Sequence, residues 1–206
     1  MSDILQKLGI RAHSTVVDLG FGQADELRGL ADIVGDKGKV YGVESQHDRV
    51  EEAEKGLRSV RNIIVLTGDV FRIPLPDRSA DYVLLKGVLH EVPNVSKALI
   101  EAARVCKQQG AILIVDFTDF PKAWLTRSNL KWRVHHPKKL LSKPLDRHPG
   151  FSRTSLEERL KEAGLKMRTY DEKIMSGSFG GHKISMFLAI GEVRDIRTLP
   201  SPTDEQ

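Results

Sequence analysis

The sequence predicts an α/β fold with a seven-stranded, mostly parallel sheet and helices on both faces. Helical and strand-like patterns alternate along the chain. The strand patterns are nearly continuous apolar runs, which is typical of strands that are covered on both faces. The last two strand patterns are separated by too few residues for a parallel crossover. We therefore expect the last strand to run antiparallel to its neighbours.

The individual elements follow in chain order. Strand patterns occupy residues 16–20, 39–44, 63–67, 81–86, 110–116, 166–175 and 183–190. Apolar residues at helical spacing predict helices over residues 23–34, 47–60, 95–106 and 156–163. The last helix is expected to begin at a capping box formed by Thr154 and Glu157 and to end at Gly164.

Length and composition indicate one soluble domain. The chain of 206 residues suits a single core over residues 1–193, and the polar segment 194–206 is expected to be a disordered tail. No apolar run reaches the roughly 18 residues of a membrane span, and the first residues show no signal-peptide pattern. The single cysteine, Cys106, is expected to be a packed core thiol. These features predict a cytoplasmic protein.

The most informative stretch is residues 16–25, where a buried strand ends in a glycine turn before a helix. Such a turn forms the ligand-binding end of an open α/β sheet. Gly20 and Gly22 fit a dinucleotide-binding loop, but Asp25 occupies the position of its third glycine. Asp18 and Asp25 would place two carboxylates beside a pyrophosphate, which is electrostatically unfavourable. The same carboxylates suit a positively charged ligand.

This stretch is similar to motif I of the class I S-adenosylmethionine (AdoMet)-dependent methyltransferases, an acid followed by x-Gly-x-Gly-x-Gly. Ala24 stands here in place of the last glycine. The later strands match the same family in order, with acids at the ends of the second and third strands and a turn at 107–110 before the fifth. The resemblance is close over residues 14–117 and loose over 150–191. It implies a Rossmann-like class I methyltransferase fold, nearest to the ubiquinone and menaquinone C-methyltransferase branch.

The resemblance also implies AdoMet as the cofactor and a set of binding residues. Glu44 would accept hydrogen bonds from the ribose hydroxyls, Asp69 would take the adenine amino group, and Phe21 would pack beside the methionine part. The full expected set is Asp18, Gly20, Phe21, Gly22, Glu44, Ser45, Asp69, Val70 and Lys86.

The segment after the fourth strand supplies the candidate catalytic residues. His90 suits a general base because an imidazole titrates near neutral pH, and Glu91 is the second candidate. A purely structural His90, which braces this loop or covers the cofactor, is the alternative. No metal site is expected, because His135, His136 and His148 have no cysteine or dense carboxylate cluster nearby.

A basic insertion over residues 121–150 distinguishes this chain. It holds eight Lys or Arg against one Asp, whereas the whole chain carries a net charge of +4. Basic residues interleaved with Trp124 and Trp132 suit an anionic small substrate, a nucleic acid, or a membrane surface that holds a lipid-like substrate. The insertion could equally be a solvated amphipathic helix packed on the sheet.

These observations predict a methyltransferase that acts on a small acceptor, with anionic molecules among the candidates, by in-line displacement. Two other classes stay open. The insertion at 121–150 could direct methylation to RNA, or the chain could be a non-catalytic AdoMet-binding module. A nicotinamide-dependent oxidoreductase is disfavoured by Asp18 and Asp25. The methyl acceptor and the oligomeric state do not follow from the sequence.

Overall fold

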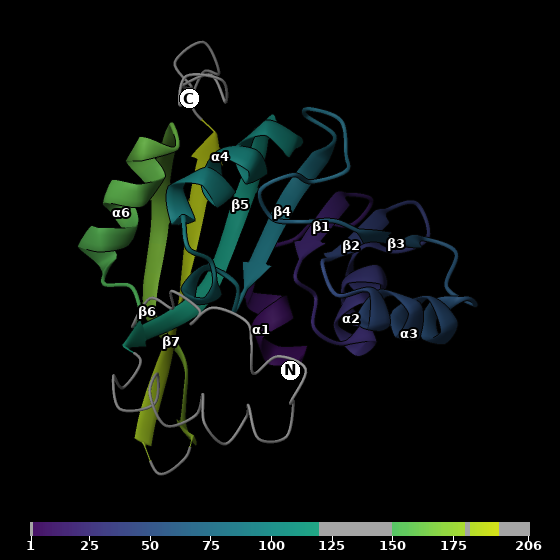
Figure 1. Cartoon of the computed structure of the whole chain (residues 1–206), viewed down its shortest axis with the longest axis horizontal. Coiled ribbons are helices and arrows are strands. Elements are labelled where there is room, and N and C mark those ends of the chain that lie inside the picture. Colours follow the sequence, from purple (N-terminus) through teal and green to yellow (C-terminus); the bar gives the residue numbers. More distant parts are fainter. Residues whose placement is uncertain (1, 120–149, 180–181, 194–206) are drawn as a thin grey trace.

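The computed structural model describes residues 2–119, 150–179 and 182–193. Within these residues, one sheet has the strand order β3-β2-β1-β4-β5-β7-β6 (Figure 1). Its strands are β1 (Thr15–Leu19), β2 (Lys39–Glu44), β3 (Ile63–Thr67), β4 (Ala80–Lys86), β5 (Cys106–Asp119), β6 (Leu165–Phe179) and β7 (His182–Val193). The seven predicted strands are therefore all confirmed.

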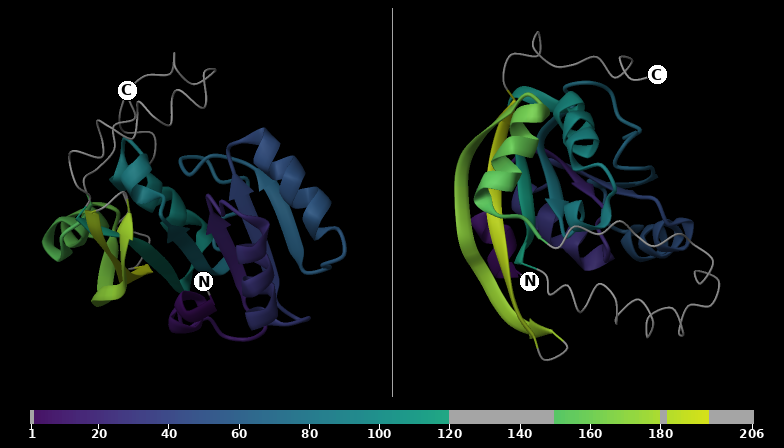
Figure 2. Two further views of the ribbon diagram at one scale, coloured as in Figure 1. Left: turned by 90° about the horizontal axis from the view of Figure 1, so that it is seen from below. Right: turned by 60° about the vertical axis from the view of Figure 1, so that its left-hand side comes forward.

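Strand direction follows the expected pattern. β1 pairs in parallel with β2 and β4, β2 with β3, and β4 with β5. β7 is antiparallel to both of its neighbours, β5 and β6, so the antiparallel last strand is confirmed. β6 and β7 are longer than predicted, and their hairpin extends beyond the parallel strands (Figure 2).

Helices pack on both faces of the sheet. The helices are α1 (Ser2–Lys7), α2 (Ala24–Val34), α3 (His47–Leu57), the short 3₁₀ helix η1 (Leu89–Glu91), α4 (Val95–Val105) and α6 (Arg153–Glu162). Buried side chains of α1, α2 and α3 share one apolar cluster with the sheet, and those of α4 and α6 share another. Alternate residues of β1 point to opposite clusters, as the two-residue period of a strand requires: Val16 belongs to the first cluster and Val17 to the second.

Two element boundaries differ from the prediction. α4 ends at Val105 and β5 is assigned from Cys106, but its register with β4 shifts between Cys106, opposite Ala80, and Ala111, opposite Tyr82, so an irregularity falls at the predicted turn over 107–110. Gly110 lies close to β4 in this irregular stretch, where an added Cβ would lie 2.6 Å from the Asp81 carbonyl oxygen. The Lys107 ammonium also lies 2.8 Å from the Asp81 carboxylate, which ties this end of β5 to β4.

The N-cap of α6 also differs from the prediction. The cap is Ser152, whose hydroxyl oxygen accepts a hydrogen bond from the Ser155 amide at 3.2 Å. Thr154 lies inside the helix, because the earlier serine already satisfies an amide that has no partner within the helix.

Cys106 is fully buried, and burial raises the pKa of its thiol to about 12, which agrees with the expected packed thiol. The tail 194–206 and nearly all of the insertion 121–150 lie outside the described residues, so a single domain over 1–193 stays a prediction. No helix in the described part of the chain has the length and apolar content to cross a membrane.

Candidate active site

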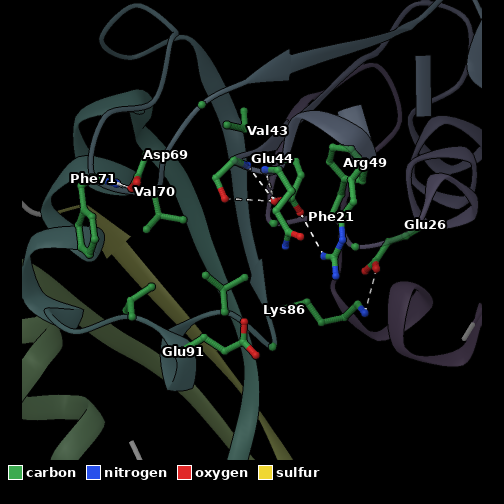
Figure 3. A pocket seen from close by; sticks show the side chains of 18 of the residues that line it. Phe21, Glu26, Val43, Glu44, Arg49, Asp69, Val70, Phe71, Lys86 and Glu91 are labelled. Carbon is green, nitrogen blue, oxygen red and sulfur yellow. Dashed lines mark hydrogen bonds and ion pairs between the residues drawn. The ribbon is translucent and has the colours of Figure 1, made fainter. Parts of the chain in front are cut away.

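The sheet order creates a crevice between β1 and β4. From β1 the chain continues to β2 on one side, and it returns to β4 on the other side. Ligands bind at such switch points, outside the carboxyl ends of the strands. A cavity of about 610 Å³ lies there (Figure 3). It is lined by the loops that follow β1, β2, β3 and β4.

The glycine loop after β1 passes very close to the chain that follows β4. Gly20 has a φ of +68°, and a Cβ at this position would lie 2.9 Å from Cγ2 of Val88. The Gly20 amide donates a hydrogen bond to the Val43 carbonyl oxygen at 2.8 Å. Gly22 also has a positive φ, of +63°. Backbone conformation therefore favours glycine at both positions, and lack of space favours it at Gly20 as well.

Glu44 ends β2 in the wall of the cavity, where only 5% of the residue is exposed. Its Oε1 accepts hydrogen bonds from the amides of Ser45, at 2.8 Å, and Gln46, at 3.0 Å. Nη1 of Arg49 lies 3.4 Å from Oε2. These contacts hold the carboxylate in one orientation, as a site for ligand hydroxyl groups requires.

Asp69 follows β3 at another part of the cavity wall. Its Oδ1 accepts a hydrogen bond from the Phe71 amide at 2.8 Å, which fixes the turn that carries Val70 and Phe71. Both apolar side chains belong to the lining. An acceptor beside an apolar surface suits a flat, nitrogen-rich ring such as a purine.

Three charged side chains meet behind the glycine loop. The Lys86 ammonium, at the end of β4, lies 2.9 Å from Oε2 of Glu26 on α2. Asp18 on β1 is 1% exposed. Burial raises the pKa of the Asp18 carboxyl well above its usual range, and the charge of Glu26 raises it further, although Lys86 lowers it. Burial likewise raises the pKa of Glu26, against the opposing effect of Lys86.

His90 lies in η1, where it contacts the end of β5. Its Nδ1 is 2.9 Å from Oδ1 of Asp116, and its amide donates a hydrogen bond to Oδ2 of the same carboxylate at 3.2 Å. Asp116 is fully buried. The His90 ring packs edge-on against Phe117, with 4.9 Å between ring centroids. On its other side, Nε2 of His90 lies 3.8 Å from Oε1 of Glu91.

The cavity brings together most of the residues that the sequence predicted for the site. Those in its lining are Gly20, Phe21, Gly22, Glu44, Ser45, Asp69, Val70, Lys86 and Glu91. The ring of Phe21 is buried in the apolar cluster below the loop. Asp18 and His90 lie outside the lining of the described cavity: Asp18 interacts electrostatically with Glu26 and Lys86, which line it, and His90 lies behind Glu91.

Among the charged residues in and around the site, Glu26, Arg49 and Asp116 were missed in the sequence. Glu26 carried a signal, because it sits four residues before Leu30 on the buried side of an amphipathic helix. Asp116 carried another, as an acid near the carboxyl end of a buried strand. No pattern in the sequence pointed to Arg49.

Over the described residues, no three His, Cys, Asp or Glu side chains are grouped to hold a metal ion, and the three histidines of the insertion lie outside those residues.

The residues present fit AdoMet. The cavity has the size of a small-molecule site. Oδ2 of Asp18 and Oε1 of Glu26 are buried, and neither has a hydrogen-bond partner among the described residues. Such orphaned carboxylate oxygens suit a cationic ligand and oppose a pyrophosphate. Glu44 and Asp69 offer acceptors for the ribose and adenine of the same nucleoside.

Comparison with known proteins identifies the family of this chain. A family model described as a methyltransferase domain matches residues 10–167. The chain is 29% identical over 116 residues to a demethylmenaquinone methyltransferase of Geobacillus stearothermophilus, covering 55% of this chain and 50% of that protein. It is 30% identical over 113 residues to a demethylmenaquinone methyltransferase of Staphylococcus epidermidis, covering 55% and 47%. The chain thus spans about half the length of these curated relatives.

Solved structures show the same architecture. A SAM-dependent methyltransferase from Aquifex aeolicus aligns over 90% of this chain and 87% of its own, with a TM-score of 0.66 and 24% identity. This likeness shows the shared fold, and the family model covers most of the chain. The chain therefore belongs to the family of class I AdoMet-dependent methyltransferase domains, and it is similar to the quinone C-methyltransferase branch.

Proposed function

We propose that this chain transfers the methyl group of AdoMet to a small acceptor that loses a proton in the reaction. The observation that carries this proposal is the cavity at the β1–β4 switch point, with its positive-φ glycine loop and oriented carboxylates. Bound AdoMet supplies a methyl carbon that its sulfonium makes electrophilic. The residues of the chain then have to hold the acceptor in line with that carbon, which can lower the barrier by roughly 7–11 kcal/mol.

The residues in and around the cavity have different roles in this proposal. Glu44 and Asp69 hold the nucleoside, and the glycine loop lets the backbone approach it closely. Glu91 faces the cavity, and His90 lies behind it with Nδ1 against the buried Asp116. When His90 is neutral, the Asp116 contact favours a proton on Nδ1, so that Nε2 is the basic nitrogen. We assign removal of the acceptor proton to His90, directly or through Glu91.

The names of the relatives guide the choice of acceptor. Both relatives described above are demethylmenaquinone methyltransferases, so a reduced quinone ring is the first acceptor class to test. Such a ring has ionisable hydroxyl groups, and removing a proton makes it a better nucleophile. The RNA alternative depends on residues 121–150, nearly all of which lie outside the described structure.

Two measurements test the proposal: ligand binding, and transfer of the label from methyl-tritiated AdoMet to an acceptor. Binding is measured first by calorimetry with AdoMet, S-adenosylhomocysteine and NADH. The protein is then incubated with reduced demethylmenaquinone, with simpler naphthoquinols, and with RNA. Binding of both sulfur nucleosides and transfer to a quinol would support the proposal. Transfer to RNA would favour the insertion-directed alternative, and binding without transfer to any acceptor would favour a non-catalytic module. A folded protein that binds neither sulfur nucleoside would overturn the proposal.

A further inference from the structure

A second cavity, of about 290 Å³, lies at the other end of the sheet. It is lined by the end of α1, the loop that follows it, and residues of β4, β5, β6 and β7. In its wall, Tyr82 on β4 lies opposite Ala111 on β5, which lies opposite Glu192 on β7. This row crosses the amino-terminal halves of β4 and β5, whereas the candidate active site lies at the carboxyl ends of the parallel strands. The two cavities share no lining residue.

This second cavity, called the basic cavity below, has more positive than negative charge in its lining. Its charged residues are Lys7, Arg11, Arg168 and Glu192. Arg168 and Glu192 pair with each other, with 3.1 Å between Nη1 and Oε1. Within the residues that the structure describes, Lys7 and Arg11 form no ion pair. Two positive charges of the lining are therefore not balanced.

Arg11 is held beside the cavity by a buried tyrosine. Its Nε donates a hydrogen bond to the Tyr82 hydroxyl at 3.1 Å, and this hydroxyl donates to the Gly9 carbonyl oxygen at 3.4 Å. Tyr82 is only 7% exposed, so the guanidinium is attached to a fixed point of the sheet. The bond to Tyr82 uses Nε, and the two Nη groups can donate to the oxygens of an anion.

Asp81 interacts electrostatically with Arg11 but does not neutralise it. Oδ1 of Asp81 lies 2.8 Å from the Lys107 ammonium, and Oδ2 accepts a hydrogen bond from the Thr15 amide at 2.8 Å. Lys107 therefore already balances the charge of Asp81, and the charge of Arg11 remains in excess.

A β-bulge brings a third cation to the basic cavity. The register between β6 and β7 shifts between Met167 and Thr169, so Arg168 is an extra residue at this point of β6. Met167 and Tyr170 both pack against the apolar cluster that contains α4 and α6. Arg168 lines the cavity on the opposite face, where α1 ends. Bulges bend a strand and change the direction of its side chains, and here the bulge adds a guanidinium to the cavity.

We infer that the basic cavity binds a small anion that carries a phosphate group, with Lys7 and Arg11 as its main ligands. A phosphate monoester carries about −1.5 to −2 charges at pH 7, which matches the two unbalanced cations. A guanidinium can bind two phosphate oxygens with parallel N–H groups. The cavity is at the lower end of the size range of small-molecule sites, so the ligand is small. This inference goes beyond the proposed function and does not depend on it.

An NMR titration of the ¹⁵N-labelled full chain provides the test. The probes are inorganic phosphate, glycerol 3-phosphate and malonate, added at constant ionic strength because screening weakens exposed charge interactions. Both phosphates should cause saturable shifts of the Gly9 and Ala111 amides, which belong to the lining. Tighter binding of one of them identifies free or esterified phosphate as the better ligand, and either result supports the site. Malonate carries two charges without phosphate geometry, so equal binding of malonate would overturn the assignment to phosphate.

The variants remove each unbalanced charge in turn. Arg11→Met should weaken phosphate binding about 10- to 100-fold, the range expected for a charge-assisted hydrogen bond. Lys7→Gln should weaken it in the same range. Lys7 is exposed at the end of α1, so this variant serves if Arg11→Met, which also loses the contact with Tyr82, fails to fold. Lys55→Met is the control, because it removes an exposed lysine of α3 outside the basic cavity.

The outcomes separate this inference from the proposed function. Weaker binding in the folded Lys7→Gln and Arg11→Met variants, with Lys55→Met unchanged, supports the site. The inference is overturned if wild type shows no saturable shift at the lining amides, or if these variants bind phosphate as wild type does. Phosphate affinity should be the same with and without S-adenosylhomocysteine, and competition between the two ligands would place the phosphate in the active-site cavity instead. A protein that binds phosphate at these amides but no sulfur nucleoside would contradict the proposed function alone.

Discussion

Asp116 and His90 form a buried contact, with 2.9 Å between Oδ1 and Nδ1, that joins the end of β5 to the loop after β4. The same carboxylate accepts hydrogen bonds from the His90 and Phe117 amides. The imidazole is therefore fixed by its backbone as well as by its ring. An orienting carboxylate of this kind sets which nitrogen of a histidine is basic.

Replacing Asp116 should test the role of His90. Asp116→Asn keeps the shape of the side chain but no longer favours a proton on Nδ1. We expect kcat for methyl transfer to fall by about 10²- to 10⁴-fold, the usual contribution of a general base, with the affinity for S-adenosylhomocysteine unchanged. Turnover assays and calorimetry measure the two quantities. His47→Gln, at an exposed histidine of α3, is the control. A folded Asp116→Asn protein with wild-type kcat would leave His90 with a structural role.

Glu44 should determine nucleoside affinity. Its carboxylate is held by two amides and by Arg49, so Glu44→Gln changes the charge with little change in shape. We expect the affinity for S-adenosylhomocysteine and for 5′-methylthioadenosine to fall together, by about 10- to 100-fold, because both ligands carry the ribose. Calorimetry checks this, with Glu51→Gln on the exposed side of α3 as the control. Equal affinities in wild type and Glu44→Gln would place the ribose elsewhere.

Gly20→Ala should reduce both stability and cofactor binding. The positive φ costs an alanine roughly 1–2 kcal/mol, and its Cβ would lie 2.9 Å from Val88 Cγ2 at the cavity wall. Gly35→Ala separates the two effects, since Gly35 has a φ of +67° but a Cβ added there would meet no atom within 4 Å. Denaturant unfolding should show a loss in both variants, and calorimetry should show weaker binding in Gly20→Ala only. Unchanged binding in Gly20→Ala would mean that the loop does not contact the ligand.

Asp18 should make the ligand-free protein sensitive to pH. Its pKa is raised in the folded state, mainly by burial, so the folded protein binds this proton more tightly than the unfolded chain does. The stabilisation from this proton is complete below the unfolded pKa of about 4, and it is lost as the pH rises through the raised folded pKa. Relative to Asp18→Asn, wild type should therefore lose thermal stability as the pH increases.

Melting curves of wild type and Asp18→Asn, recorded from about pH 4 upward, measure the difference in thermal stability between the two proteins. Taking this difference cancels the contributions of the other titrating groups. Ligand affinity should follow the opposite trend. The ionised carboxylate favours a cationic ligand, so wild type should bind AdoMet, which carries a sulfonium and an ammonium group, more tightly as the pH rises, and Asp18→Asn should lose this dependence. Parallel melting curves for the two proteins at every pH would contradict the assignment of a raised pKa.

Much of the fold was predictable because its signals are local. Alternating helical and strand patterns, the Gly20–Gly22 turn and the acids at the ends of β2 and β3 all depend on short segments, and the structure contains them. The element boundaries were less predictable. The irregular start of β5 involves Asp81, a residue on another strand, which Lys107 and Gly110 approach closely.

The sequence by itself determined the order of the elements, the direction of the last strand and the glycine loop, since periodicity and turn chemistry encode them. The tertiary structure decided which side chains meet. Strand order and register bring Asp116 to His90 and Lys86 to Glu26, pairs that no local pattern joins. It also decided the upward shift in the pKa of Asp18, because desolvation depends on all the atoms packed around a carboxyl group and not on its neighbours in the chain.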